Sequence, residues 1–66
     1  SFYPWTDKEY GVGDSFWVKR TEEQVTDGKG RPNVPRSETV GGRVWRTSAA
    51  YHEGTKQYGY RVTRVA

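Results

Sequence analysis

The chain has 66 residues, no cysteine, a formal net charge of +3 and 32% hydrophobic residues. It is therefore long enough for one small domain, which disulfides cannot stabilise. A domain of this size buries only about 60% of the surface exposed by its unfolded chain, which leaves little room for a deep catalytic cleft. No apolar run approaches the roughly 20 residues that cross a bilayer, and the amino end lacks the order of a signal peptide. We therefore expect a single non-enzymatic domain over residues 1–66, cytoplasmic and not associated with a membrane.

The apolar residues are of the kinds that favour β-strands. Leu, Ile, Met and Cys are absent, so the core must be built from eight Val, three Ala and ten aromatic residues. Val and aromatic side chains fit a half-buried pleated surface, and large rings supply buried area to a short chain. Eight Gly and three Pro keep the elements short. We predict an α+β domain with a small antiparallel sheet of two to four short strands, packed with one helix around an aromatic and valine core.

The amino-terminal residues 1–5 contain three aromatic rings and Pro4. Because Pro is excluded from central strands, we expect this segment to form an arm laid across the core. The alternative is an exposed aromatic contact surface for a partner. Residues 6–9 fit a single capped helical turn, with Thr6 as the cap.

Residues 12–20 give the clearest strand pattern in the first half of the chain. The alternation places Phe16 and Val18 on one face and Ser15, Trp17 and Lys19 on the other. Residues 21–36 are mostly polar and contain the sequence Asp27-Gly28-Lys29-Gly30 and two Pro. We predict a flexible loop there, with a hairpin across Asp27-Gly28 as the alternative.

The second half of the chain contains a helical pattern followed by a strand pattern. Val40, Val44, Ser48 and Tyr51 recur at helical spacing, which predicts the one helix at about residues 40–54. Residues 58–65 then alternate as a strand. This alternation puts Arg61 and Arg64 on opposite faces.

Three segments together resemble a family of small phage-encoded proteins. They are the VGDSFWV sequence of residues 12–18, the RTSAAY sequence of residues 46–51 and the YRVTRV sequence of residues 60–65. The resemblance implies a small α+β phage protein, located in the host cytoplasm, and it supplies no activity. The segment after RTSAAY is shorter here than in the family pattern.

Known catalytic and ligand-binding patterns are missing from the sequence. One His and no Cys do not provide the four ligands of a structural zinc site. Ser48 and His52 have no oxyanion partner, and residues 27–31 lack the GxxxxGK[ST] spacing of a phosphate-binding loop. We predict no catalytic residue, no metal and no cofactor.

Basic and aromatic residues alternate in the second half of the chain. Residues 1–33 carry five Lys/Arg against six Asp/Glu, and residues 34–66 carry six against two, so the halves have net charges of −1 and +4. Cations neutralise phosphates, and exposed rings stack on bases. We therefore predict a protein that binds nucleic acid through a surface containing Lys29, Arg31, Arg43, Arg46, Tyr51, Lys56, Tyr60, Arg61 and Arg64.

The alternative is a protein-interaction module that binds and modulates a host or phage protein, because surfaces rich in aromatic residues and Arg also resemble protein interface hot spots. Unpaired edge strands in so small a sheet would also allow a homodimer.

Overall fold

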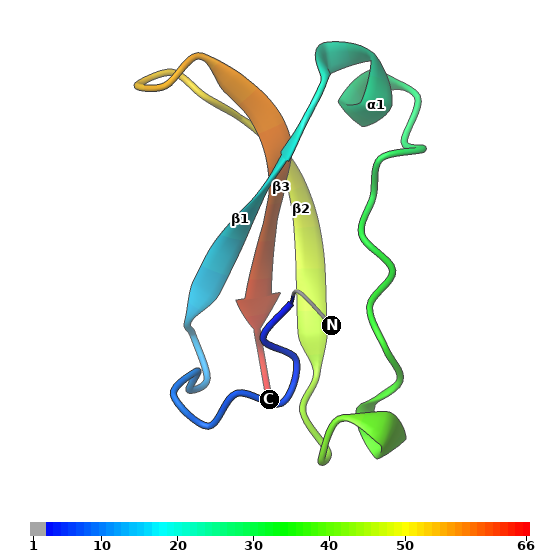
Figure 1. Cartoon of the computed structure of the whole chain (residues 1–66), viewed down its shortest axis with the longest axis vertical. Helices are drawn as coiled ribbons and strands as arrows, with labels where there is room; N and C mark the ends of the chain where they lie inside the picture. Colours follow the sequence, from blue (N-terminus) through cyan, green and yellow to red (C-terminus); the bar gives the residue numbers. More distant parts are fainter. Residues whose placement is uncertain (1–2) are drawn as a thin grey trace.

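Three antiparallel strands make up most of the domain (Figure 1). The computed structural model describes residues 3–66, so Phe2 of the predicted arm lies outside the described residues. The sheet has the order β1-β3-β2, with β1 at Ser15–Arg20, β2 at Trp45–His52 and β3 at Gln57–Arg64. A short helix, α1 (Glu22–Thr26), and a 3-10 turn, η1 (Ser37–Thr39), lie between β1 and β2. The predicted α+β class and antiparallel sheet are confirmed, with strands predominating.

The two strands predicted from alternation form where expected. β3 is the central strand and pairs with β1 so that Val62 faces Phe16 and Tyr60 faces Val18. These four side chains share the face assigned to Phe16 and Val18 in the sequence. Val62 and Tyr60 are fully buried.

The predicted helix at residues 40–54 is wrong, because Trp45–His52 is strand β2. Gly41 and Gly42 both have positive φ, at 68° and 82°, which breaks any helix that began near Val40. From Trp45 onward the chain pairs with β3 along the whole strand. An isolated helix of this length is only marginally stable. Pairing with a buried central strand therefore stabilises the β conformation more than the helical spacing of the apolar residues stabilises a helix.

The only α-helix among the described residues lies instead in the polar segment after β1. Thr21 begins α1 with a capping box. The backbone N–H of Gln24 donates to the Thr21 hydroxyl at 3.2 Å, and the backbone N–H of Thr21 donates to the Gln24 side-chain oxygen at 2.9 Å. Because Gln24–Thr26 are helical, the alternative hairpin across Asp27-Gly28 does not form. The mobility of residues 21–36 stays a prediction.

The amino-terminal arm covers the core, as predicted. Trp5 is only 8% exposed, and its ring meets Trp45 edge-on with centroids 5.4 Å apart. Tyr3 stacks on Phe16 at 5.7 Å. The segment between these rings and β1 contains turns rather than the predicted helical turn, with the Asp7 carboxylate accepting from the backbone N–H of Glu9. No helix among the described residues is both long and apolar enough to cross a membrane.

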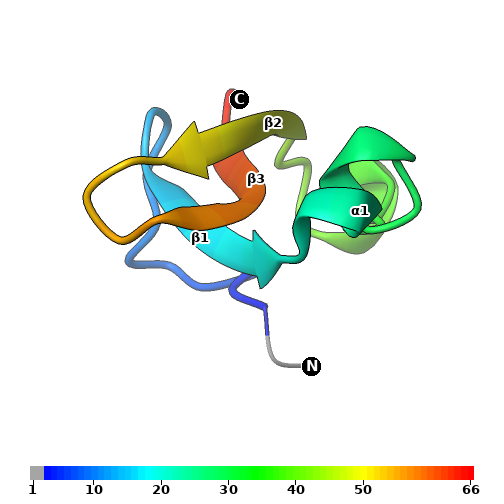
Figure 2. The ribbon, with the colours of Figure 1, turned by 90° about the horizontal axis from the view of Figure 1, so that it is seen from above.

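The two faces of the sheet are covered unequally. Figure 2 shows α1 and the segment that follows it on one side of the strands. On that side the arm, Val40 and Val34 join the core. The opposite side, here called the open face, carries the other alternate residues of the three strands, and the core cluster contains none of them.

Trp17 lies on the open face, where its indole crosses Gly59 of β3. A Cβ at position 59 would collide with the carbonyl oxygen of Val18 and would lie 2.8 Å from the Trp17 ring. Glycine is therefore required in the middle of the central strand, where it normally weakens a sheet.

We expect Gly59→Ala to lower the free energy of unfolding by about 1–3 kcal/mol, because the added methyl group must displace either backbone or indole. Urea unfolding followed by circular dichroism measures this. Gly11→Ala is the matched control, since its Cβ would meet only the Asp14 carboxylate at 3.7 Å. An equal loss in both variants would contradict the packing of Trp17 on Gly59.

Candidate nucleic-acid interface

The charges of the chain are separated by element. All eight Asp and Glu residues lie outside the three strands. The strands themselves carry five cations, which are Lys19, Arg20, Arg46, Arg61 and Arg64. The sheet is therefore a positively charged platform, and the acidic groups lie in its connections.

The open face combines residues of all three strands. Because alternate residues share a face and the register is known, its members follow directly. They are Ser15, Trp17 and Lys19 of β1, Arg46, Ser48, Ala50 and His52 of β2, and Gln57, Gly59, Arg61 and Thr63 of β3. Each strand contributes one cation, and Lys19, Arg46 and Arg61 are all exposed.

Trp17 contacts two other side chains of the open face, those of Arg61 and His52. The Arg61 guanidinium lies over the indole at 5.7 Å from its centroid, and Arg61 Nη1 donates to Ser15 Oγ at 3.1 Å. His52 meets the indole edge-on with ring centroids 6.1 Å apart. The indole and the imidazole thus come together across β3, which separates β1 from β2.

A hollow of about 230 Å³ opens beside this cluster, lined by Trp17, His52, Thr55, Gln57 and Arg61. The β2–β3 turn supplies one wall. There the backbone N–H of Thr55 donates to His52 Nδ1 at 3.2 Å. Since Nδ1 accepts, the proton of a neutral imidazole lies on Nε2.

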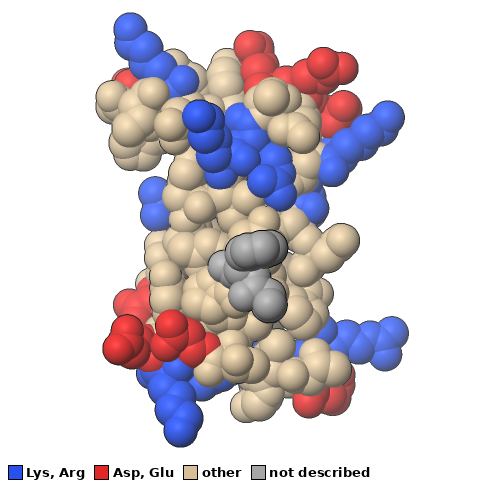
Figure 3. Space-filling view, viewed as in Figure 1, with Lys and Arg blue, Asp and Glu red and all other residues tan. Residues whose placement is uncertain are grey.

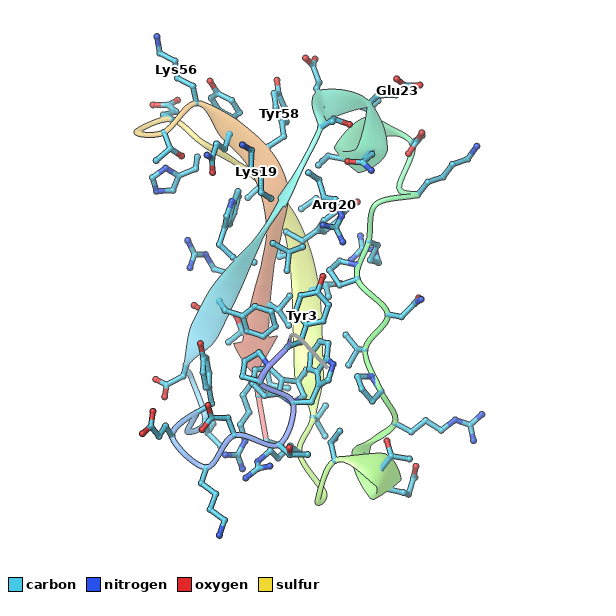
Figure 4. All side chains as sticks on the ribbon, in the orientation of Figure 1. Tyr3, Lys19, Arg20, Glu23, Lys56 and Tyr58 are labelled. Carbon is cyan, nitrogen blue, oxygen red and sulfur yellow. The ribbon has the colours of Figure 1, made fainter. Side chains whose placement is uncertain are left out.

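The structure brings some of the predicted residues together. Arg46 and Arg61 share the open face, where Arg46 pairs with Thr63 and Arg61 with Ser48, two positions further along the strands. Lys56 is in the turn beside the hollow, and Figure 4 shows its side chain pointing away from the sheet at the tip of the hairpin.

Tyr60 and Arg64, two other predicted contacts, lie on the covered side of the sheet. Tyr60 is fully buried, so its ring cannot stack on a base. Arg64 donates to the backbone carbonyls of Tyr10 at 2.7 Å and Ala66 at 3.1 Å, and the first of these bonds ties the end of β3 to the segment before β1. The prediction that Arg61 and Arg64 point to opposite faces is confirmed.

Arg31 also lies over the covered side, where it holds the loop on the sheet. Its guanidinium is 5.1 Å from the centroid of the Tyr60 ring, and Nη1 donates to the hydroxyl and the carbonyl of Thr47. Nearby, Arg20 Nε donates to the carbonyl of Gly30 at 2.7 Å. These two arginines hold the chain where it leaves α1.

The other predicted residues are scattered. Lys29 is exposed in the turn after α1, and Arg43 lies before β2, outside the face that contains Arg46. Arg43 and Arg46 would share a face if residues 40–54 formed the predicted helix, and in the structure they do not. Tyr51 is 45% exposed and packs on Tyr58 at 4.6 Å, on the face opposite to Trp17.

Trp17, Lys19 and His52 are the aromatic and basic residues of the open face that the predicted site lacks. The alternation of β1 already separates Trp17 and Lys19 from the core. His52 can be placed on this face only when residues 45–52 are recognised as a strand, because alternate strand residues such as Arg46 and His52 then share a face.

A larger hollow, about 630 Å³, lies along α1 and is lined by Thr21, Glu22, Glu23, Thr26 and Asp27. It contains three carboxylates and no cation, so it would repel phosphate. On the face shown in Figure 3, acidic side chains gather toward the two ends of the long axis. Within residues 3–66 no group of three His, Cys, Asp or Glu side chains could hold a metal ion.

The chain matches no family model, no curated protein and no solved structure. Its resemblance to small phage-encoded proteins therefore stays a prediction.

We expect Arg31→Ala to lower the free energy of unfolding by about 1 kcal/mol, because it removes a cation–π contact and hydrogen bonds at a partly exposed site. Lys29→Ala removes the same charge two residues away and should change stability by less than about 0.5 kcal/mol. Urea unfolding of both variants measures the difference. Equal effects would show that Arg31 does not hold the loop.

Proposed function

We propose that the protein binds nucleic acid through the open face of its sheet. The observation that carries the proposal is the arrangement of Lys19, Arg46 and Arg61, with one exposed cation on each strand and no carboxylate in any strand. A nucleic acid binds favourably to such a surface, because each phosphate that a cation neutralises releases condensed counterions.

The aromatic group at the centre of the face also supports nucleic acid as the ligand. Trp17 is paired with Arg61 and its indole meets His52, so two aromatic rings lie on the same face as the cations. Aromatic rings beside basic residues are the usual means of holding exposed bases. The carboxylates lie in the connections, where they would disfavour binding of a polyanion elsewhere on the molecule.

The test is a titration of labelled single- and double-stranded DNA at about 50 and 200 mM salt. Three phosphate contacts to a single strand predict a slope of log K against log salt of about −2, which weakens binding roughly 20-fold over this range. In Arg46→Ala/Arg61→Ala one contact remains, so the slope should fall to about −0.7 and binding at 50 mM should weaken by about tenfold or more.

Lys8→Ala/Arg36→Ala is the matched control. Both side chains are exposed and lie outside the strands, and the two substitutions remove the same total charge as Arg46→Ala/Arg61→Ala. It should keep the wild-type slope. Equal losses in the two double variants would show that net charge alone drives binding. Absence of binding to either DNA at 50 mM would refute the proposal and favour the protein-interaction alternative.

A further inference from the structure

The outer edge of β2 has backbone groups that the sheet does not pair. β2 is the last strand in the order β1-β3-β2, so only one of its edges bonds to β3. The backbone N–H of Val65 donates to the carbonyl of Val44 at 2.8 Å, which directs the backbone of Val44 toward the end of β3. Because this direction alternates along an antiparallel strand, the odd-numbered residues of 45–51 direct their N–H and C=O groups outward. The side chain of Arg31 agrees with this, since its Nη1 donates to the carbonyl of Thr47.

Beyond Thr47 this edge is unprotected. Among residues 3–66, none bonds to the outward N–H or C=O of Ala49 or Tyr51. Residues 48–51 are all exposed, and they include neither Lys nor Pro, which commonly protect sheet edges. In the described part of the chain, Tyr51 is the only large apolar side chain of a strand that is exposed. The edge therefore offers both free backbone groups and apolar surface.

The outer edge of β1 is protected. The backbone N–H of Arg64 donates to the carbonyl of Asp14 at 2.9 Å, and the same alternation then directs the backbone of Lys19 outward. Arg20 Nη1 donates to this outward carbonyl of Lys19 at 2.9 Å, and the Lys19 side chain is exposed and charged. Of the two outer strands, β2 is thus the one open to a further strand.

We propose that the edge of β2 pairs with the same edge of a second copy, antiparallel and about a two-fold axis at Ala50. In this register Ala49 of each copy faces Tyr51 of the other, and each such pair exchanges both backbone hydrogen bonds. The exposed Tyr51 ring lies beside the small Ala49 side chain of the second copy. At the axis two Ala50 methyl groups face each other, so the strands can approach closely. The two open faces then lie on the same side of one continuous sheet.

The charges beside the paired segment are complementary. Glu53 follows β2 directly and is exposed, and the register brings it to the level of Thr47 of the second copy. The guanidinium of Arg31 lies there, because it bonds to Thr47. Two-fold symmetry repeats this pair of opposite charges at the other end. His52 faces Ser48, so no like charges oppose each other within the segment. An edge that complements itself in this way fits a second copy of the chain.

Sedimentation equilibrium over about 0.01–1 mM tests the proposal, since an interface of one strand pair is small and its association is weak. The apparent mass should rise with concentration from 7.6 kDa toward twice that value. A mass that stays at 7.6 kDa at the highest concentration would overturn the proposal.

Ala49→Pro tests the outward backbone directly. It removes an outward N–H and leaves the bonds between β2 and β3 in place, as edge strands allow. Association should weaken by about tenfold or more, because the lost bond occurs twice in the symmetric pair. Ala49→Thr is the matched control, since it keeps the N–H and should associate like the wild type. An Ala49→Pro variant with an unchanged circular dichroism spectrum and wild-type association would refute the pairing.

Ala50→Glu and Ala50→Lys form a second test, which does not depend on the folding of the proline variant. Each alone brings two like charges together at the axis and should remain a monomer at concentrations where the wild type associates. An equimolar mixture of the two should associate, because opposite charges then face each other. A mixture that sediments as monomers would contradict the proposed register and with it the dimer.

Discussion

The structure depends on a shortage of apolar side chains. The arm, the loop and the sheet together bury Trp5, Val18, Val40, Trp45, Tyr60 and Val62, and this cluster covers only one face of the strands. A chain without Leu, Ile or Met has few further apolar residues, and the exposed Val12, Val44 and Val65 lie outside the strands, so they build no second layer on the sheet. The other face must therefore be polar, which allows it to carry cations and a partly exposed ring. The interaction surface follows from the same composition that limits the core.

The central strand connects the two faces. Tyr60 and Val62 point into the core, and Gly59 and Arg61 belong to the open face. The absence of a side chain at position 59 lets Trp17 of one outer strand reach His52 of the other. One glycine in β3 thus brings together rings that the strand order would otherwise keep apart.

Alternation made β1 and β3 predictable from the sequence, because each strand has one buried and one exposed face. β2 was missed since Val40, Val44, Ser48 and Tyr51 fall by chance at helical spacing. Only the pairing with β3 and the positive φ of Gly41 and Gly42 select a strand there. Of the predicted site, Arg46 and Arg61 lie on one face of the sheet. The prediction was wrong about Tyr60, because aromatic residues in so small a chain are needed first for the core.

The three cations of the open face come from three strands, so backbone hydrogen bonds set their spacing, with neighbouring strands about 4.8 Å apart. No loop has to become ordered to assemble them. A surface that is preorganised in this way loses little conformational entropy when it binds. Its apparent affinity would then follow the fraction of folded molecules, so a substitution in the distant core would weaken binding only by unfolding the sheet.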